Sequence, residues 1–337
     1  MQKNRSLKYN LIIEGDNLLV MKDLINKGYK NKIDLVYIDP PFATNNTFRK
    51  GKKRTSTISS SKSDEIAYTD NRLGKEFIEY LKKRLILIKE LMSPNSSIYL
   101  HIDYKIGHYV KVVMDEVFGI KNFKNDITRI KCNPKNFKRN GYGNMKDLIL
   151  FYTKTNNFIW HEPLVKRKDN EIEKLFKKID KNGRRYTTTP LHAPGETKNG
   201  LTGQIWKNMY PPKGRHWRYE PKVLDKLNKQ GLIEWSKTGV PRKIIYADEL
   251  PTKRLQDIWN FKDPQNPEYP TQKNLEMLKL IVKTSSNKNS LVLDCFCGSG
   301  TTMLAADILG RRWIGIDSSK QAIKVSQNRL KQSKSKK

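Results

Sequence analysis

One stretch decides the fold that this sequence predicts: Leu291-Val292-Leu293-Asp294-Cys295-Phe296-Cys297-Gly298-Ser299-Gly300-Thr301-Thr302. The apolar run 291–294 predicts a buried strand that ends in an acid, and residues 302–309 predict a helix that ends at Gly310. Gly298 and Gly300 allow a tight turn between them and let a ligand approach the backbone. In a doubly wound α/β sheet, ligands bind at this place, beyond the carboxyl end of a strand.

The next strand, 313–317, also ends in an acid, Asp317, seventeen residues after Gly300. An acid at this position can accept hydrogen bonds from the ribose hydroxyls of an adenosine-containing cofactor. The dinucleotide fingerprint does not fit, because its third glycine is absent. The alternative is a purely structural corner between strand and helix.

A second motif, Asp39-Pro40-Pro41-Phe42, follows the apolar run 33–38. The two prolines donate no backbone N–H and fix an extended turn. Asp39 and the Pro40 carbonyl can accept both hydrogens of an exocyclic amino group, and Phe42 can stack on a planar base. The alternative is a proline-stiffened loop with a solvated Asp39.

Strands and helices alternate on both sides of these motifs, which predicts an α/β domain with a mainly parallel sheet. The predicted strands are 11–13, 33–38, 97–102, 147–152, 291–294 and 313–317, and the predicted helices are 18–25, 76–92, 105–118, 271–285, 302–309 and 319–330. Residues 1–155 would form the catalytic half of this domain and residues 266–330 the cofactor-binding half. Residues 156–265 lose the alternation and hold five of the six tryptophans, so they predict an inserted, less regular lobe. Residues 331–337 predict a basic, frayed tail.

The charge of the chain points to a polyanionic partner. Its 337 residues include 66 Lys and Arg against 34 Asp and Glu, a net charge of +32. Lysine-rich composition drift accounts for part of this excess, and nucleic acid accounts for it better. No apolar run reaches the roughly 18 residues of a membrane span, and residues 1–10 lack a secretory apolar region. The three cysteines, Cys132, Cys295 and Cys297, are too few for a disulfide framework and favour the cytoplasm.

The motifs together resemble the bacterial amino-methylating DNA methyltransferases that use S-adenosylmethionine (SAM). In that family an Asp/Asn/Ser-Pro-Pro-aromatic tetrapeptide is catalytic and a Phe-x-Gly-x-Gly turn binds SAM. Here the catalytic motif comes first, which is similar to the β group, and the resemblance is close over about residues 9–155 and 265–330. It implies a Rossmann-like SAM-dependent methyltransferase fold with circularly permuted motif order. Residues 156–265 would then be the target-recognition region.

The resemblance also assigns the site residue by residue. The catalytic residues would be Asp39, Pro40, Pro41 and Phe42, and no metal would be needed. The cofactor would be bound by Asp16, Thr271, Gln272, Lys273, Asp294, Phe296, Cys297, Gly298, Ser299, Gly300, Thr301 and Asp317. Three positions depart from the family pattern: Cys295 stands where Pro is frequent, Asn274 where Pro commonly follows the Gln-Lys pair, and Asp317 where Glu is commoner.

Two basic segments are candidates for DNA contact. Residues 43–72 predict a basic, Ser/Thr-rich loop, in which Arg49, Lys50, Lys52, Lys53 and Arg54 would clamp phosphates or form only a solvated face. Arg215, His216 and Arg218 would contact the DNA backbone from the middle lobe. His101 is interpreted either as an acid/base group or as a strand-end histidine with a structural hydrogen bond.

The predicted function is methyl transfer from SAM to adenine N6 in duplex DNA after base flipping, as the modification enzyme of a restriction-modification system. The alternatives are a cytosine-N4 methyltransferase, a catalytically silent DNA-binding specificity subunit and an RNA methyltransferase. Cytosine C5 methylation would need a cysteine nucleophile in a Pro-Cys pair, and the sequence has none. The expected partner is double-stranded DNA, with a cognate restriction endonuclease and a homodimer left open, and no membrane.

Overall fold

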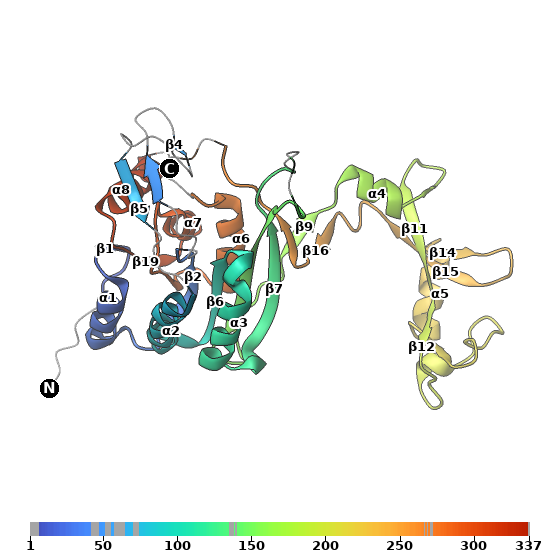
Figure 1. The fold of residues 1–337 in the computed structure, drawn as a ribbon. Coiled ribbons are helices and arrows are strands. Elements are labelled where there is room, and N and C mark those ends of the chain that lie inside the picture. The colour runs from blue at the N-terminus through green and yellow to red at the C-terminus, as the bar shows by residue number, and fades with distance from the viewer. Residues whose placement is uncertain are drawn as a thin grey trace. The chain divides into compact units, whose positions relative to one another are not determined.

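The computed structural model describes residues 7–41, 74–134, 140–265 and 272–335, the single residues 138, 267 and 269, and the backbone of three strands between residues 47 and 69. The chain divides into two compact units. The main unit comprises Met1–Pro163 and Gln256–Lys337, and the insert unit comprises Leu164–Leu255. Each unit has its own sheets and is described separately (Figure 1).

An eight-stranded sheet forms the centre of the main unit, in the order β1-β19-β18-β2-β6-β8-β7-β17. Its strands are β1 (Leu11–Glu14), β2 (Ile33–Ile38), β6 (Met92–Ile102), β7 (Phe123–Ile130), β8 (Lys146–Thr153), β17 (Ile258–Asn260), β18 (Leu291–Asp294) and β19 (Arg312–Asp317). All neighbours are parallel except β8, which runs antiparallel to β6 and β7. The sheet therefore has the mainly parallel, doubly wound order that the sequence predicts.

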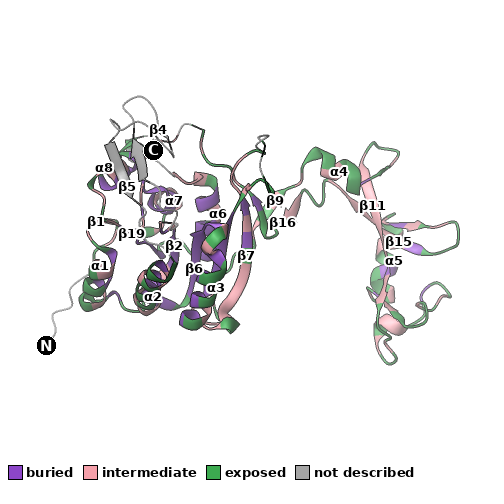
Figure 2. Ribbon diagram, in the orientation of Figure 1, coloured by how far each residue is buried: buried purple, intermediate pink, exposed green. Residues whose placement is uncertain are grey.

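Six helices cover this sheet. They are α1 (Asn17–Leu24), α2 (Gly74–Leu91), α3 (Tyr104–Phe118), α6 (Leu275–Ser285), α7 (Thr301–Ile308) and α8 (Lys320–Ser335). Helices α1, α2 and α3 are neighbours and share one apolar core with the central strands, whereas α6, α7 and α8 form a second set of neighbours. Buried residues concentrate in the central strands and on the inner sides of these helices (Figure 2). Among the described residues, no helix is long and apolar enough to cross a membrane.

The carboxyl ends of five neighbouring parallel strands carry acids. Asp294 and Asp317 end β18 and β19, Asp39 and Asp103 directly follow β2 and β6, and Asp16 lies two residues after β1. Because parallel strands end at the same edge of a sheet, these five carboxylates form a row there. This edge carries the candidate site.

The insert unit is built from short antiparallel strands. Its elements are β9 (Leu164–Lys166), α4 (Asp169–Leu175), β10 (Lys178–Ile179), β11 (Arg185–Pro190), β12 (His192–Pro194), β13 (Arg215–Trp217), α5 (Pro221–Lys229), β14 (Ile233–Trp235), β15 (Pro241–Tyr246) and β16 (Thr252–Arg254). Strands β10, β11, β15 and β14 form one sheet, and β12–β13 and β9–β16 form two hairpin-like pairs. A small core of Trp206, Trp217 and three aliphatic residues holds it together.

Four expectations need correction. The helix predicted over 271–285 begins at Leu275, because Asn274 has an extended backbone and caps it. The tail predicted to fray from residue 331 continues α8 to Ser335. The basic loop 43–72 contains the antiparallel strands β3 (Thr47–Lys50), β4 (Thr55–Ser56) and β5 (Glu65–Thr69).

The fourth correction concerns the middle region, which the sequence predicts as one irregular lobe over 156–265. Residues 258–260 instead form β17, which joins the main sheet in parallel to β7. Strand β7 itself is absent from the predicted elements, since its apolar residues do not form a continuous run. The region also contains regular antiparallel pairs, whose partners lie too far apart in the sequence for local patterns to reveal them.

Candidate active site

Asp39 lies between Asp294 and Asp103 in the row of acids, directly after β2, and forms an ion pair with Lys273 from the segment before α6. The Lys273 Nζ lies 2.6 Å from Asp39 Oδ2, and the two side chains are 11% and 18% exposed. Asp39 Oδ1 is buried and has no hydrogen-bond partner among the residues that the structure describes. The carboxylate thus has one oxygen held by a cation and one acceptor left open. Pro40 is buried and Pro41 half-buried, whereas Phe42 lies outside the described residues.

The glycine turn lies next to the end of β2, between α7 and β18, the strand that pairs with β2. Gly298 and Gly300 have left-handed backbones, with φ of 49° and 76°. A Cβ on Gly300 would lie 2.7 Å from Ser326 Oγ, whereas a Cβ on Gly298 would meet nothing closer than the Phe296 carbonyl at 4.0 Å. Gly300 is therefore required by packing, and Gly298 leaves open space beside the turn.

Asp317, which ends β19, holds this turn. Its Oδ2 accepts the Gly298 N–H at 2.8 Å and its Oδ1 accepts the Ser319 N–H at 2.9 Å. Burial raises the pKa of Asp317 above its ordinary value, against these backbone hydrogen bonds. Each carboxylate oxygen has a second lone pair, so Asp317 can still accept from a ligand hydroxyl.

Asp294 is more deeply buried, and its two oxygens are used within the turn. They accept the Phe296 N–H at 3.0 Å and the Thr302 hydroxyl at 2.5 Å. Burial raises the pKa of Asp294 to about 7, with smaller contributions from the charges of Asp39 and Asp317. Asp294 therefore shapes the turn, and its binding of a cofactor stays a prediction.

Arg329 of α8 supports the turn from the other side, and sequence reasoning missed it. Its Nη1 donates to the Ser299 carbonyl at 2.7 Å and to the hydroxyls of Ser299 and Thr301, each at 3.0 Å. The Cys297 side chain is buried, while Phe296 packs against Tyr80 with ring centroids 6.4 Å apart. A single arginine in a basic C-terminal helix carries no local signal of such a role.

Asp16 joins the end of β1 to the same region. It caps α1 by accepting the N–H groups of Leu18 and Leu19, and its Oδ2 lies 3.1 Å from Arg84 Nη2. Arg84 also donates to Asn17, and Asn17 Nδ2 donates to the Cys295 carbonyl at 2.7 Å. The predicted cofactor residue Asp16 is thus fixed next to the turn by helix capping.

Tyr269, Gln272 and Lys273 precede α6 and lie near the two motifs. The Asp317 charge and, above all, burial raise the pKa of Tyr269 to about 12, so Tyr269 lies near the cofactor-side acid. The Gln272 N–H donates to the Tyr269 carbonyl at 3.2 Å, and Lys273 pairs with Asp39. Thr271 lies outside the described residues. This segment therefore connects the two motifs that the sequence singles out.

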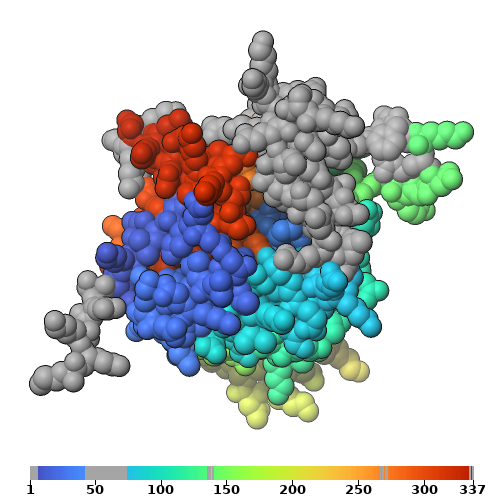
Figure 3. All heavy atoms as spheres, turned by 60° about the vertical axis from the view of Figure 1, so that its left-hand side comes forward, coloured from blue at the N-terminus to red at the C-terminus, as the bar shows by residue number. Residues whose placement is uncertain are grey.

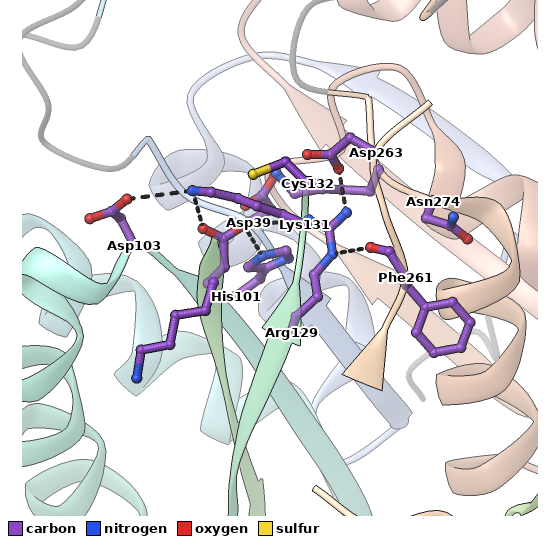
Figure 4. A network of polar contacts seen from close by, with 12 residues as sticks. Asp39, His101, Asp103, Arg129, Lys131, Cys132, Phe261, Asp263 and Asn274 are labelled. Carbon is purple, nitrogen blue, oxygen red and sulfur yellow. Dashed lines mark hydrogen bonds and ion pairs between the residues drawn. The ribbon is translucent and has the colours of Figure 1, made fainter. Parts of the chain in front are cut away.

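A buried polar network lies on the other side of Asp39 (Figure 4). His101 Nδ1 contacts the Tyr37 hydroxyl at 2.8 Å and its Nε2 contacts Asp147 Oδ2 at 3.1 Å. Burial lowers the pKa of His101, and because an ionised Asp147 can only accept, His101 Nε2 donates the hydrogen bond between them. Burial opposes ionisation of Asp147, but the hydrogen bond from His101 and the charges nearby hold its pKa well below the ordinary value. These contacts give His101 the structural partners that one of its two interpretations expects.

The network continues to β7. Lys131 Nζ lies 2.6 Å from Asp147 Oδ1 and 3.9 Å from Asp103. Arg129, whose side chain is fully buried, contacts Asp147 and forms an ion pair with Asp263. Among the described residues, no group of three or more His, Cys, Asp or Glu side chains could hold a metal ion.

The candidate DNA contacts are spread over both units. Arg215 and Arg218 are exposed in the insert unit, and half-buried His216 contacts the Gly195 carbonyl at 2.7 Å. Arg49 and Lys50 lie in β3, of which only the backbone is described, and Lys52, Lys53 and Arg54 lie outside the described residues. In the main unit, the surface is hollowed between the blue N-terminal and red C-terminal segments, and mid-blue atoms of the segment containing β2 lie at the bottom (Figure 3).

A doubly wound sheet with an acid-ended glycine turn and an Asp-Pro-Pro motif at the same edge defines the class: a methyltransferase with a nucleoside cofactor. The chain belongs to the DNA methylase family, whose model matches residues 33–328. This membership confirms the predicted fold class and SAM as the methyl donor. The family comprises adenine-N6 and cytosine-N4 enzymes, so the target base is open.

Relatives and solved structures agree with this assignment. The type II methyltransferase M.EcaI of Enterobacter cloacae is 41% identical over 95% of this chain and 69% of its own length. The Mod subunit of the type III restriction-modification enzyme StyLTI of Salmonella typhimurium is 27% identical over 87% of this chain, which spans only 49% of that subunit. The structure of the PvuII DNA methyltransferase (cytosine-N4-specific) is 13% identical, with a TM-score of 0.53 over 96% of this chain and 86% of that chain, and shows the shared fold alone.

Proposed function

We propose that this chain transfers the methyl group of SAM to the exocyclic N6 of adenine in duplex DNA, as the modification enzyme of a restriction-modification system. The observation that carries the proposal is the Asp39 carboxylate at the end of β2. One of its oxygens is held by Lys273 and the other is a buried acceptor with no partner in the described part of the chain. An unpaired buried acceptor is costly, and the amino group of a base would satisfy it.

The residues around the glycine turn fit SAM. Gly298 leaves room beside the backbone, and Asp317 keeps lone pairs for ribose hydroxyls. SAM is cationic at sulfur, which suits an edge lined by carboxylates. When bound there, it supplies an electrophilic methyl group.

Asp39 and Pro40 would prepare the nucleophile. The lone pair of an exocyclic amine is delocalised into the base, so the amine is a poor nucleophile. Asp39 Oδ1 and the Pro40 carbonyl accept the two amino hydrogens, which favours tetrahedral nitrogen and frees the lone pair. Fixed acceptors of this kind need no reorganisation during the reaction. Asp39 in place of Ser favours adenine over cytosine.

Extrusion of the base from the duplex costs a few kcal/mol. Stacking on Phe42 would offset about 1–3 kcal/mol of this cost.

The insert unit provides a DNA-contact surface, which we call the arginine cluster: Arg215, Arg218 and Arg242, next to His192. Burial first, and then these three charges, lower the pKa of His192, so the arginines lie close together. None of the three forms an ion pair with an acid in the described part of the chain. Guanidinium groups without acidic partners are suited to phosphates. On this basis, residues 164–255 act as the target-recognition region.

The partners and the compartment follow from this function. The enzyme works on DNA in the cytoplasm, and a restriction endonuclease that cuts the same sequence is its functional counterpart. A homodimer stays a prediction that sedimentation of the purified chain would test. A silent specificity subunit would bind DNA without methyl transfer, and an RNA methyltransferase would prefer structured RNA in competition with duplex DNA.

Substitution of Asp39 tests the proposal directly. Asp39→Ala removes the acceptor for the amino group, and we expect methyl transfer to fall below detection while SAM and DNA affinities stay within several-fold. The measurement is mass spectrometry of nucleosides from duplex DNA incubated with SAM and each protein. Near wild-type formation of N6-methyladenine by Asp39→Ala would contradict the catalytic role, and N4-methylcytosine from the wild type would correct the base.

A further inference from the structure

Lys273 lies in the segment that the family resemblance assigns to the cofactor, yet its ammonium group contacts the catalytic acid. The Nζ–Oδ2 distance of 2.6 Å is that of a charge-assisted hydrogen bond, and both side chains are largely buried. Asp39 is therefore fixed from one side only. The contact decides which of its two oxygens is open to a ligand.

Lys273 is itself held by its chain neighbours. Asn274 caps α6 through its Oδ1, which accepts the Glu276 N–H at 2.9 Å, and its Nδ2 donates to the Lys262 carbonyl at 2.8 Å. The position of Lys273 is thus tied both to the start of α6 and to the segment that follows β17.

That segment is anchored in turn to the buried network (Figure 4). Arg129 Nε donates to the Phe261 carbonyl at 2.8 Å, and its other end pairs with Asp263. The Asp263 N–H donates to the Lys131 carbonyl at 3.0 Å. Hydrogen bonds and the chain itself therefore connect β7 through residues 261–263 to Asn274, the chain neighbour of Lys273.

We propose that Lys273 is a positioning residue for methyl transfer: it holds Asp39 Oδ2, so that Oδ1 alone faces the target amino group in a fixed orientation. This inference rests on the proposed function. It differs from the expectation that Lys273 serves mainly to bind the cofactor, because a cofactor residue would contribute to SAM affinity. A positioning residue contributes to the rate at saturation.

The test is a comparison of SAM affinity with single-turnover rate in Lys273→Gln. We expect the rate at saturating SAM and DNA to fall about 100-fold, the effect of a misplaced reacting group. The Kd for SAM, measured by calorimetry, should stay within about threefold of wild type, since ground-state binding is unaffected. Lys279→Gln is the control, because Lys279 lies on α6, the helix that follows Lys273, and pairs with exposed Glu276. It should change neither quantity.

If the loss of the buried charge unfolds Lys273→Gln, Lys273→Arg provides a second test. It retains the cation but presents a planar, wider group to Asp39. We expect a slower single turnover than wild type, with unchanged SAM affinity.

Two outcomes would overturn the positioning role: SAM affinity that falls in Lys273→Gln or Lys273→Arg while the saturated rate holds, or wild-type values of both in Lys273→Gln. A wild-type chain that methylates no DNA would instead overturn the proposed function itself.

Discussion

At the scale of single residues, the carboxylates in the row of acids differ in their hydrogen-bond partners. Asp39 has one oxygen without a hydrogen-bond partner among the described residues. Asp317 accepts two backbone N–H groups. Both oxygens of Asp294 accept hydrogen bonds from the turn and the start of α7. Burial penalises the charge of Asp294 and raises its pKa to about 7.

Asp294 makes the stability of the fold depend on pH. Its ordinary pKa of 3.8 rises to about 7 in the folded chain, so the native state binds more protons than the unfolded state between these values. The contribution of Asp294 to the free energy of unfolding therefore falls as pH rises through this window, by up to about 1.4 kcal/mol per pH unit. We expect Asp294→Asn to remove this fall.

Urea denaturation between about pH 4 and pH 7 measures the effect. Asp23→Asn, on the exposed side of α1, should keep the wild-type slope. Identical slopes in the wild type and in Asp294→Asn would show that Asp294 does not titrate in this window.

Sequence reasoning located the residues whose roles depend on their neighbours in the chain. Asp39 directly follows β2, Asp317 ends β19 and Gly298 lies in the turn after β18, so strand patterns alone place them at one edge. The Lys273–Asp39 pair and the support from Arg329 were beyond such reasoning. Their partners lie far away in the sequence, and side-chain contacts at that distance leave no local pattern.

At the scale of elements, the turn between β18 and α7 contains two glycines, Gly298 and Gly300, that have different roles. Both have left-handed backbones, so either substitution by Ala strains the chain by roughly 1–2 kcal/mol. Only Gly300 would also overlap Ser326, which adds about 1–3 kcal/mol of overpacking. We expect Gly300→Ala to lower the melting temperature more than Gly298→Ala.

Gly298→Ala should instead affect the cofactor, because its new methyl group occupies the open space beside the turn. Thermal unfolding without ligand and titration with SAM, carried out on both variants, separate the two effects. If Gly298→Ala were less stable than Gly300→Ala and bound SAM normally, the roles assigned to the two glycines would be wrong.

Helices and buried parallel strands were predictable within a few residues, since their apolar periodicity is strong. Strand β7 and the pairs of the insert unit were not, because half-buried antiparallel strands carry a weaker pattern. The start of α6 depended on one cap residue, Asn274, which also replaces the proline that the family favours.

At the scale of the whole molecule, the net charge of +32 fits a polyanionic partner, and we propose the arginine cluster as one place where DNA binds. Each phosphate contact releases counterions, so the affinity for DNA falls with salt in proportion to the number of contacts. We expect the double substitution Arg215→Gln and Arg218→Gln to reduce the slope of log affinity against log salt by about two.

Lys226→Gln with Lys229→Gln on α5 removes the same charge from another exposed part of the insert unit. Fluorescence anisotropy with one duplex at several salt concentrations compares the variants. If both double variants reduced the slope of log affinity against log salt equally, the overall positive charge of the insert unit would set the salt dependence. The arginine cluster would then have no special role.

Composition favoured a nucleic-acid partner, and the family resemblance carried by several motifs in order predicted methyl transfer. The recognition sequence was not predictable, since base contacts depend on the geometry of the loops in residues 156–265.

The central claim is that Asp39 directs methylation to adenine N6, and one measurement tests it most directly. DNA from a methylation-free bacterial host that expresses this chain is sequenced by single-molecule modification calling, alongside DNA from a host that expresses Asp39→Ala. The account predicts N6-methyladenine at one recurring short sequence with the wild type and none with the variant. Modified cytosine at that sequence, or N6-methyladenine that persists with Asp39→Ala, would contradict it.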